Sequence, residues 1–181
     1  MLDALSPYLE AGTPIVGLEP SCLLTLRDEF SVILPGAQTK ALAERAQLFE
    51  EFVESERAAG RFQLPFTPIE GRTALLHGHC HQKAFGTIGA AVKALQLIPG
   101  LSVETFDSTC CGMAGSFGYE TEHYEMSLKI GELGVLPRIR AAPTGTLVAA
   151  NGTSCRHQIA DGTGREARHL VRILDDASAG A

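Results

Sequence analysis

Short apolar runs alternate with longer amphipathic segments along this chain. The apolar runs predict buried strands at residues 14–18, 73–77, 101–106 and 146–150. The amphipathic segments predict helices at residues 21–30, 39–59, 81–97, 121–133, 154–160 and 168–176. Strands separated by helices are typical of βαβ units, whose strands run parallel. The pattern therefore predicts an α/β protein, with a largely parallel sheet and helices on both faces in Rossmann-like layers.

The longest predicted helix, 39–59, carries an apolar stripe that we interpret as core packing. The stripe follows the helical period and consists of Leu42, Ala46, Phe49 and Val53. Gly60 ends this helix, and the proline-containing stretch up to residue 70 is typical of a connector.

The chain also contains a weak internal repeat. Residues 15–22 and 147–155 each read as a strand, a polar turn and then Ser-Cys at the start of a helix. The second copy has three further cysteines before its Ser-Cys, whereas the first copy would need a segment ahead of Met1 to carry their equivalents. We therefore expect residues 1–70 to be the truncated remainder of a first repeat plus a connector, and residues 71–181 to be a second repeat.

Composition and charge argue against several functions. The chain has 15 basic and 21 acidic residues, and its formal net charge of −6 does not suit a phosphate backbone, so we expect no nucleic-acid partner. No uncharged apolar run reaches the roughly 20 residues of a membrane-spanning helix, and the N-terminus does not resemble a signal peptide. We expect a cytoplasmic protein without membrane insertion, which would reach the inner membrane only peripherally, through partners.

The five cysteines indicate a metal site. Their odd number excludes a complete set of intramolecular disulfides, and the adjacent pair Cys110-Cys111 does not suit disulfide geometry. In a reducing compartment, clustered thiols more often bind a metal or perform chemistry. The chain has neither a Cys-x-x-Cys pair nor a ferredoxin-type run, since 29 residues separate Cys80 from Cys110 and 43 separate Cys111 from Cys155.

Every cysteine follows the end of a predicted strand. In parallel sheets, ligands gather beyond the carboxyl ends of the strands, so two adjacent thiolates and two distant ones can surround one metal centre. Thiolates favour zinc, copper(I) or iron–sulfur over harder ions. The candidate ligands are Cys22, Cys80, Cys110, Cys111 and Cys155.

Four local motifs together resemble one protein family. They read Gly-Leu-Glu-Pro-Ser-Cys at 17–22, His-Gly-His-Cys-His-Gln-Lys-Ala at 77–84, Cys-Cys-Gly-Met-Ala-Gly-Ser-Phe-Gly at 110–118 and Asn-Gly-Thr-Ser-Cys at 151–155. They resemble the cysteine-rich CCG domain, which occurs in heterodisulfide reductase and in the iron–sulfur subunits of glycolate oxidase and anaerobic glycerol-3-phosphate dehydrogenase. Their residues are similar in particular to those in the C-terminal part of FAD-linked oxidases of the D-lactate dehydrogenase/glycolate oxidase type.

This resemblance implies an electron-transfer module with no catalytic residue of its own. An iron–sulfur cluster of the [4Fe–4S] type would be held by Cys80, Cys110, Cys111 and Cys155, and Cys22 would be the last ligand of another site. FAD, on the missing remainder of the parent oxidoreductase, would oxidise a 2-hydroxy acid. The electrons would then pass through the iron–sulfur sites to an acceptor that the sequence does not identify.

The chain departs from the family motif after Cys155. The motif closes with Cys-x-x-Cys, whereas here Arg-His-Gln follows the cysteine. The candidates to replace the missing ligand are His79, His81 and His157.

Other residues near the cysteines are expected to act on the site less directly. His79 and His81 flank Cys80 and are also interpreted as neighbours that tune its thiolate through hydrogen bonds. Gly112, in the glycine-rich loop, would let backbone amides approach the sulfurs of a cluster. The histidine at the end of the 73–77 strand is interpreted as structural.

Two alternatives stay open. The isolated chain could hold zinc, or no metal, and serve as a structural docking module without a redox role. Alternatively, Cys80 could be the nucleophile of a thiol enzyme, because a helix N-terminus and nearby histidines would lower its pKa.

Overall fold

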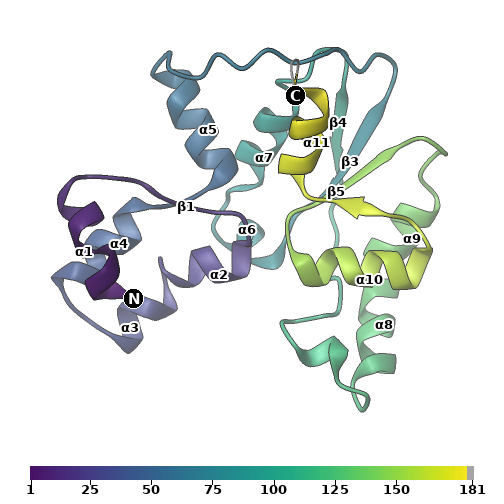
Figure 1. The fold of residues 1–181 in the computed structure, drawn as a ribbon. Helices are drawn as coiled ribbons and strands as arrows, with labels where there is room; N and C mark the ends of the chain where they lie inside the picture. Colours follow the sequence, from purple (N-terminus) through teal and green to yellow (C-terminus); the bar gives the residue numbers. More distant parts are fainter. Residues whose placement is uncertain (179–181) are drawn as a thin grey trace. The chain divides into compact units, whose positions relative to one another are not determined.

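The computed structural model describes residues 1–178. The chain forms two compact units. The first unit is Met1–Phe62, and the second begins at Gln63. Each unit contains parallel strands with helices packed around them (Figure 1), which confirms the predicted α/β class. The strands are divided between two separate sheets, one in each unit, rather than joined in one sheet.

A four-stranded parallel sheet forms the middle layer of the second unit. Its strand order is β4-β3-β5-β6. The strands are β3 (Thr73–His77), β4 (Ser102–Thr105), β5 (Leu147–Ala150) and β6 (Ala167–Arg168). Leu75 and Leu76 of β3 are both buried, because helices cover the two faces of a sheet of this kind.

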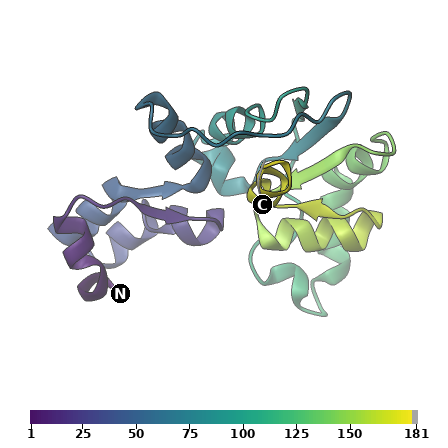
Figure 2. The ribbon, with the colours of Figure 1, turned by 45° about the horizontal axis from the view of Figure 1, so that its top comes forward.

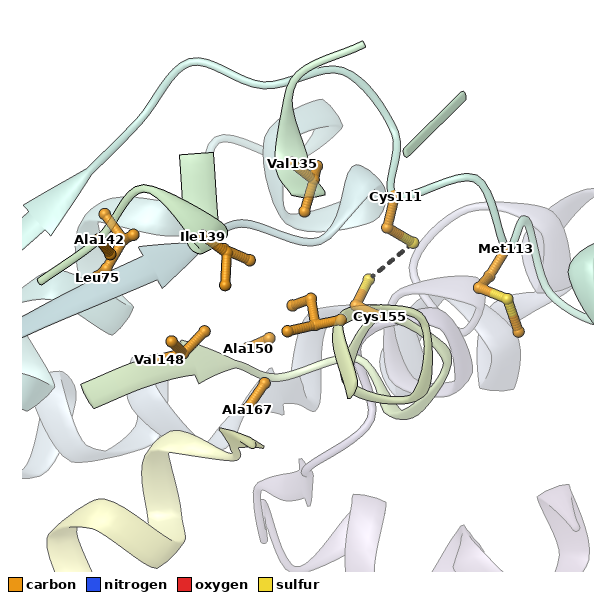
Figure 3. Packing of buried hydrophobic residues seen from close by; sticks show 11 residues of the cluster. Leu75, Cys111, Met113, Val135, Ile139, Ala142, Val148, Ala150, Cys155 and Ala167 are labelled. Carbon is orange, nitrogen blue, oxygen red and sulfur yellow. Dashed lines mark hydrogen bonds between the residues drawn. The ribbon is translucent and has the colours of Figure 1, made fainter. Parts of the chain in front are cut away.

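Helices cover both faces of this sheet. They are α6 (Cys80–Ala84), α7 (Ile88–Leu95), the short 3₁₀ helix η1 (Phe117–Tyr119), α8 (Tyr124–Glu132), α9 (Val135–Arg140), α10 (Thr153–Thr163) and α11 (Leu170–Ala177). α7 packs with α11 on one face, and α8 and α9 pack with α10 on the other (Figures 1 and 2). Val135, Ile139 and Val148 fill the space between α9 and the sheet (Figure 3).

In the first unit, β1 (Ile15–Gly17) and β2 (Ala46–Leu48) form a two-stranded parallel sheet. The helices of this unit are α1 (Leu2–Glu10), α2 (Pro20–Thr25), α3 (Glu29–Ile33), α4 (Ala37–Arg45) and α5 (Phe49–Ala58). Side-chain hydrogen bonds hold β2 in place. Arg27 Nε donates to the Ala46 carbonyl oxygen at 2.8 Å, and its other two nitrogens donate to the carboxylate of Glu51. That carboxylate also accepts from the backbone N–H of Leu48.

The prediction of one continuous helix over 39–59 is wrong. The structure has two helices there, α4 and α5, and the strand β2 lies between them. The apolar stripe is compatible with this break, because Leu42 of α4, Ala46 of β2 and Val53 of α5 are all buried. The helical pattern was overridden by a tertiary interaction, since Ala46 to Leu48 pair in register with Ile15 to Gly17.

Two other predicted helices are also interrupted. The segment 21–30 divides into α2 and α3, and the segment 81–97 divides into α6 and α7. Gly86 lies in the second break with φ of +67°, a left-handed conformation that ends a helix. The strand over 73–77 has the predicted bounds, whereas α1, α9 and β6 were not predicted. Within residues 1–178, no helix combines the length and the hydropathy needed to cross a bilayer.

Candidate metal centre

The carboxyl end of the four-stranded sheet contains a reversal in strand order. The chain passes from β3 to β4 on one side, and then returns to β5 on the other side of β3. The segments that leave β3 and β5 therefore lead to opposite faces, and the crevice between two such strand ends is where α/β proteins bind ligands. His77 ends β3 and is in register with Ala150, which ends β5.

The side chains of four cysteines meet at this end of the sheet. Cys111 and Cys155 point toward one another, with their Sγ atoms 3.4 Å apart (Figure 3). Cys110 interacts with the side chains of both Cys111 and Cys80, so the four sulfurs form a continuous series. Burial increases along the series, because Cys80 is exposed, Cys110 is intermediate, and Cys111 and Cys155 are buried. The protein therefore presents a cluster of thiols that is open at one end and closed at the other.

The loop that carries Cys110 directs backbone N–H groups at the sulfur of that residue. The N–H of Gly112 donates to Cys110 Sγ at 3.3 Å, and the N–H of Ala114 is directed to it as well. This conformation needs left-handed backbone, with φ of +101° at Gly112 and +42° at Ala114. A Cβ on Gly112 would also collide with the backbone oxygen of Ser127. Glycine is thus required at position 112 for both reasons, and the backbone N–H groups of this loop face the sulfur of Cys110.

Neighbouring groups shift the pKa values of the four thiols in opposite directions, down for Cys110 and Cys155 and up for Cys80 and Cys111. Hydrogen bonds from Cys111 and Cys80, together with the backbone N–H groups, lower the pKa of Cys110. The side chain of Cys111 lowers the pKa of Cys155 despite its burial, and the imidazoles of His77 and His79 lower it further. Thiolates are the form of cysteine that binds metals, and these shifts favour the thiolate at Cys110 and Cys155.

The other two thiols retain their protons more strongly. The pKa of Cys111 is raised by its interactions with Cys110 and Cys155 and by burial. The pKa of Cys80 is raised by its hydrogen bond with Cys110 and by desolvation, and Lys83 opposes this rise only in part. The Cys110 side chain and desolvation thus act against the lowered pKa that a nucleophilic Cys80 would need.

Lysine 83 holds helix α6 against the loop before Cys110. Its Nζ donates to the carbonyl oxygen and the hydroxyl of Ser108, at 2.5 and 3.1 Å, and to the carbonyl oxygen of Thr109 at 3.3 Å. Lys83 lies one turn after Cys80 on α6. These bonds therefore keep Cys80 and Cys110 close together although 29 residues separate them.

A buried polar network holds the Cys111 side of the loop. Gln158 of α10 donates to both the carbonyl oxygen and the hydroxyl of Ser127 of α8, each at 3.0 Å. The Ser127 hydroxyl in turn contacts the sulfur of Met113, which lies two residues after Cys111. All three side chains are buried, so this network joins α8, α10 and the loop at fixed positions.

His79 and His81 lie next to Cys80, and they also have a structural role at the start of helix α6. The Nδ1 atom of His79 accepts the backbone N–H of His81 and caps helix α6, while Gln82 accepts the backbone N–H of His79. The two imidazole rings stack, with centroids 5.4 Å apart. His79 also lies against Gly152, where an added Cβ would meet both its ring and Cys155 Sγ. His79 is therefore a neighbour of the Cys155 sulfur, whereas the sequence pattern placed it beside Cys80 alone.

His157 does not belong to the group of close donor atoms that Cys111 and Cys155 form. It is exposed on α10, and its Nδ1 is 2.6 Å from the hydroxyl of Tyr119. The physical reason is helical geometry, because a residue two positions after Cys155 points to a different side of the helix.

His77 is the residue that sequence reasoning did not select. One of its ring nitrogens and the sulfurs of Cys111 and Cys155 all lie within 4.8 Å of one another. The side chain is fully buried, at 0% exposure. The available signal was its place as the last residue of a buried strand, directly before the loop that carries Cys80.

Cys22 lies in the other unit. It is an exposed residue of α2, shortly after β1. Like Cys155, it lies on a helix with Ser-Cys that follows a strand, and the strands β1 and β2 are parallel as β5 and β6 are. The connection differs in length, because α3 and α4 follow α2 before β2, whereas α10 alone separates β5 from β6.

The donor set suits a soft metal centre. Two thiolates on a tetrahedral ion with bonds of about 2.3 Å lie about 3.8 Å from each other. The Sγ atoms of Cys111 and Cys155 are 3.4 Å apart, close to that separation. Backbone N–H groups directed at Cys110 stabilise negative charge on sulfur, and a buried imidazole nitrogen lies near the sulfurs of Cys111 and Cys155. Sulfur and imidazole donors select zinc, copper(I) or iron–sulfur centres.

Comparison with known proteins connects the chain to dehydrogenases. It is 29% identical over 168 residues to a subunit of the anaerobic glycerol-3-phosphate dehydrogenase of Escherichia coli strain K12, a match that covers 93% of this chain and 41% of that protein. It is 30% identical over 174 residues to D-2-hydroxyglutarate dehydrogenase of the same strain, with 95% of this chain and 16% of that protein covered. The D-2-hydroxyglutarate dehydrogenase of Pantoea ananatis is 29% identical, and the match again covers 95% of this chain and 16% of that protein.

The chain thus spans less than half the length of these curated relatives. The predicted relationship to part of a longer oxidoreductase is confirmed at this level. No family model matches the chain, and no solved structure matches it.

Proposed function

We propose that this chain is an iron–sulfur cluster-binding, electron-transfer domain of a longer FAD-linked oxidoreductase. The parent protein would act on a 2-hydroxy acid, of which D-lactate and glycolate are examples. One relative is a D-2-hydroxyglutarate dehydrogenase, and its substrate is also a 2-hydroxy acid. The FAD and the substrate site belong to the remainder of that protein, and this chain contributes no catalytic residue.

One observation carries the proposal. The thiols of Cys80, Cys110, Cys111 and Cys155 come from three strand ends and meet in one series of sulfur contacts. A structural core does not need four sulfurs gathered at one sheet edge, and the lowered pKa of Cys110 and Cys155 favours thiolates, which are costly to bury without a positive centre. A centre that binds several thiolates at once accounts for this arrangement.

These four cysteines would hold the cluster, and Cys22 would belong to a second site. When bound, such a cluster accepts and releases single electrons. The chain's own groups would adapt the site to that task. The N–H groups of Gly112 and Ala114 stabilise charge on the Cys110 sulfur, and burial at Cys111 and Cys155 excludes water. Hydrogen bonds to sulfur and low solvent exposure are among the factors that set the reduction potential of a cluster.

The assignment of Cys22 depends on the internal repeat. In both segments a strand is followed by a helix with Ser-Cys and pairs in parallel with the next strand, which supports the proposal that residues 1–70 and 71–181 derive from one repeated unit. Cys22 would then correspond to Cys155, and its partner cysteines would lie in another segment of the parent protein.

The experiment is anaerobic reconstitution of the purified chain with iron and sulfide. We expect a brown protein with broad visible absorption, about four irons and four acid-labile sulfides per chain, and a paramagnetic signal after reduction. Cys110→Ser and Cys155→Ser should each abolish the cluster. Cys22→Ser is the matched control and should retain it, because Cys22 lies in the other unit. A protein that stays colourless, or that loses iron equally in all three variants, contradicts the proposal.

A structural zinc site is the second candidate, and a specific observation favours it. The His77, Cys111 and Cys155 donor atoms lie within 4.8 Å of one another, a spacing that suits a single ion. Purification without added metal separates the two candidates. One tightly bound zinc that resists replacement by iron and sulfide would favour the structural module.

A further inference from the structure

Histidine 77 has one ring nitrogen with a partner and one without. Its Nδ1 lies 3.3 Å from the hydroxyl of Ser108, and its ring packs near Phe106, with centroids 5.9 Å apart. Its Nε2 is buried and has no hydrogen-bond partner among residues 1–178. Since Nδ1 is turned to Ser108, we take Nε2 as the nitrogen that joins the sulfurs of Cys111 and Cys155 in their close group.

A buried polar atom without a partner needs a physical explanation. Leaving such an atom unsatisfied destabilises the folded protein, so most buried nitrogens in proteins have a partner. The surroundings of His77 are rigid, because β3 lies in the middle of the sheet and pairs on both sides. The ring is therefore held near the sulfurs of Cys111 and Cys155, and Nε2 makes no hydrogen bond of ordinary geometry with either sulfur.

We propose that His77 is a metal ligand through Nε2, next to Cys111 and Cys155. This inference rests on the proposed function only in requiring that the sulfur cluster holds a metal. His77 would supply the fifth donor of the site, in the place of the cysteine that is missing after Cys155.

The other side of the ring has the form expected of a metal-bound histidine. A ligand that coordinates through Nε2 carries its proton on Nδ1 and donates it to a nearby oxygen, which fixes the orientation of the ring. Ser108 offers that oxygen, and Lys83 holds Ser108 through bonds to both its hydroxyl and its carbonyl. The link from Lys83 to Ser108 to His77 thus orients the ligand from outside the site.

The three histidines that the sequence indicated are less suited to this position. His79 uses Nδ1 to cap α6, and His81 stacks against it at the exposed Cys80 end of the series. The Nδ1 of His157 bonds Tyr119 on the exposed side of α10. Among residues 1–178, only His77 joins Cys111 and Cys155 in a group of close metal-binding atoms.

Nuclear magnetic resonance of the histidine rings tests this without any substitution. The ¹⁵N-labelled chain is recorded with long-range ¹H–¹⁵N correlation, first reduced and metal-free and then with one equivalent of Zn²⁺ alone. Of the six histidines, we expect one to take the Nδ1–H form and to show a large shift of Nε2 on zinc addition. His77→Gln should remove that resonance, whereas His157→Gln should leave it in place.

Zinc affinity gives the second measurement. We expect His77→Gln to bind Zn²⁺ at least about tenfold more weakly than the unchanged chain, while His157→Gln binds it equally well. Circular dichroism shows whether His77→Gln is folded, and the spectrum of the unchanged chain stands even if it is not. If no Nε2 shifts, or if the shifted nitrogen persists in His77→Gln, the proposal is overturned.

Failure of this inference can be distinguished from failure of the proposed function. A brown, iron-loaded protein in which no histidine nitrogen couples to the cluster in pulsed EPR would overturn His77 as a ligand and leave the redox function intact. A chain in which His77 binds zinc but which never takes up iron and sulfide would support His77 as a ligand and overturn the proposed redox function.

Discussion

Cys111 and Cys155 are 44 positions apart in the chain, yet their sulfurs lie 3.4 Å from each other in the interior of the second unit. The sequence pattern does not fix the distance between the two sulfurs, since Cys111 belongs to a loop and Cys155 to the first turn of α10. The contact exists because β4 and β5 lie on either side of β3 and end at the same edge of the sheet.

Oxidation of the metal-free chain should join these two residues. With hydrogen peroxide as the oxidant, the two thiols lose two electrons and two protons, the peroxide is reduced to water, and a Cys111–Cys155 disulfide forms. Peptide mapping by mass spectrometry should find this crosslink before any that contains Cys22, which lies exposed in the other unit. Bound metal should protect both thiols, and a dominant crosslink elsewhere would contradict the sulfur arrangement.

Substitution of Gly112 should disturb both stability and metal binding. Gly112→Ala forces a side chain into a backbone with φ of +101° and against the Ser127 oxygen, so the loop must shift. We expect unfolding to become easier by about 1–3 kcal/mol, together with weaker metal uptake, since the N–H group that faces Cys110 moves as well.

Gly115→Ala is the matched control for that substitution. Gly115 also has a left-handed backbone, at +69°, but no atom lies within 4 Å of an added Cβ. It should cost only about 1–2 kcal/mol of conformational strain and leave metal binding unchanged. Urea unfolding and metal titration measure the two effects, and equal losses of metal binding in both variants would argue against a specific part for Gly112.

Loss of the buried hydrogen bonds between α8 and α10 should destabilise the protein more than loss of an exposed glutamine amide. Gln158→Leu removes two hydrogen bonds to Ser127 and leaves buried groups unsatisfied, so we expect a loss of about 1–3 kcal/mol in urea unfolding. Gln96→Leu is the control, because Gln96 is exposed at the end of α7 and should stay within about 0.5 kcal/mol. A similar effect of the two substitutions would show that this network does not hold the loop.

An exposed ion pair gives a small dependence of stability on pH. A hydrogen bond from Arg168 lowers the pKa of Asp176 in the folded protein, so the stabilisation is present above the ordinary aspartate pKa and is lost as pH falls through the lowered value. Melting temperatures of the unchanged chain and of Asp176→Asn should differ slightly at neutral pH and converge in acid. The difference should shrink at high salt, because exposed pairs are screened. A difference that grows in acid would contradict the assignment.

Local pattern was sufficient for much of the fold. The strand over 73–77 was predicted with its observed bounds, because a buried run of five residues between turn signals has few other interpretations. The order of strands and helices also led to the α/β class, and it indicated the carboxyl edge of the sheet, where the four cysteine side chains meet, as the place of the candidate site. The helix over 39–59 was wrong because periodicity describes which side chains are buried, and it does not report that Ala46 to Leu48 pair with another strand.

The amino-acid sequence alone identified cysteines 80, 110, 111 and 155 as one set, since thiol chemistry and the topology of parallel strands both depend on residue type and order. It left open which histidine accompanies them, and it selected the residues nearest to cysteines in the chain. The packed structure points to His77 instead, because burial and direction depend on which strands lie side by side. Those are distances across the fold, and no local run of residues contains them.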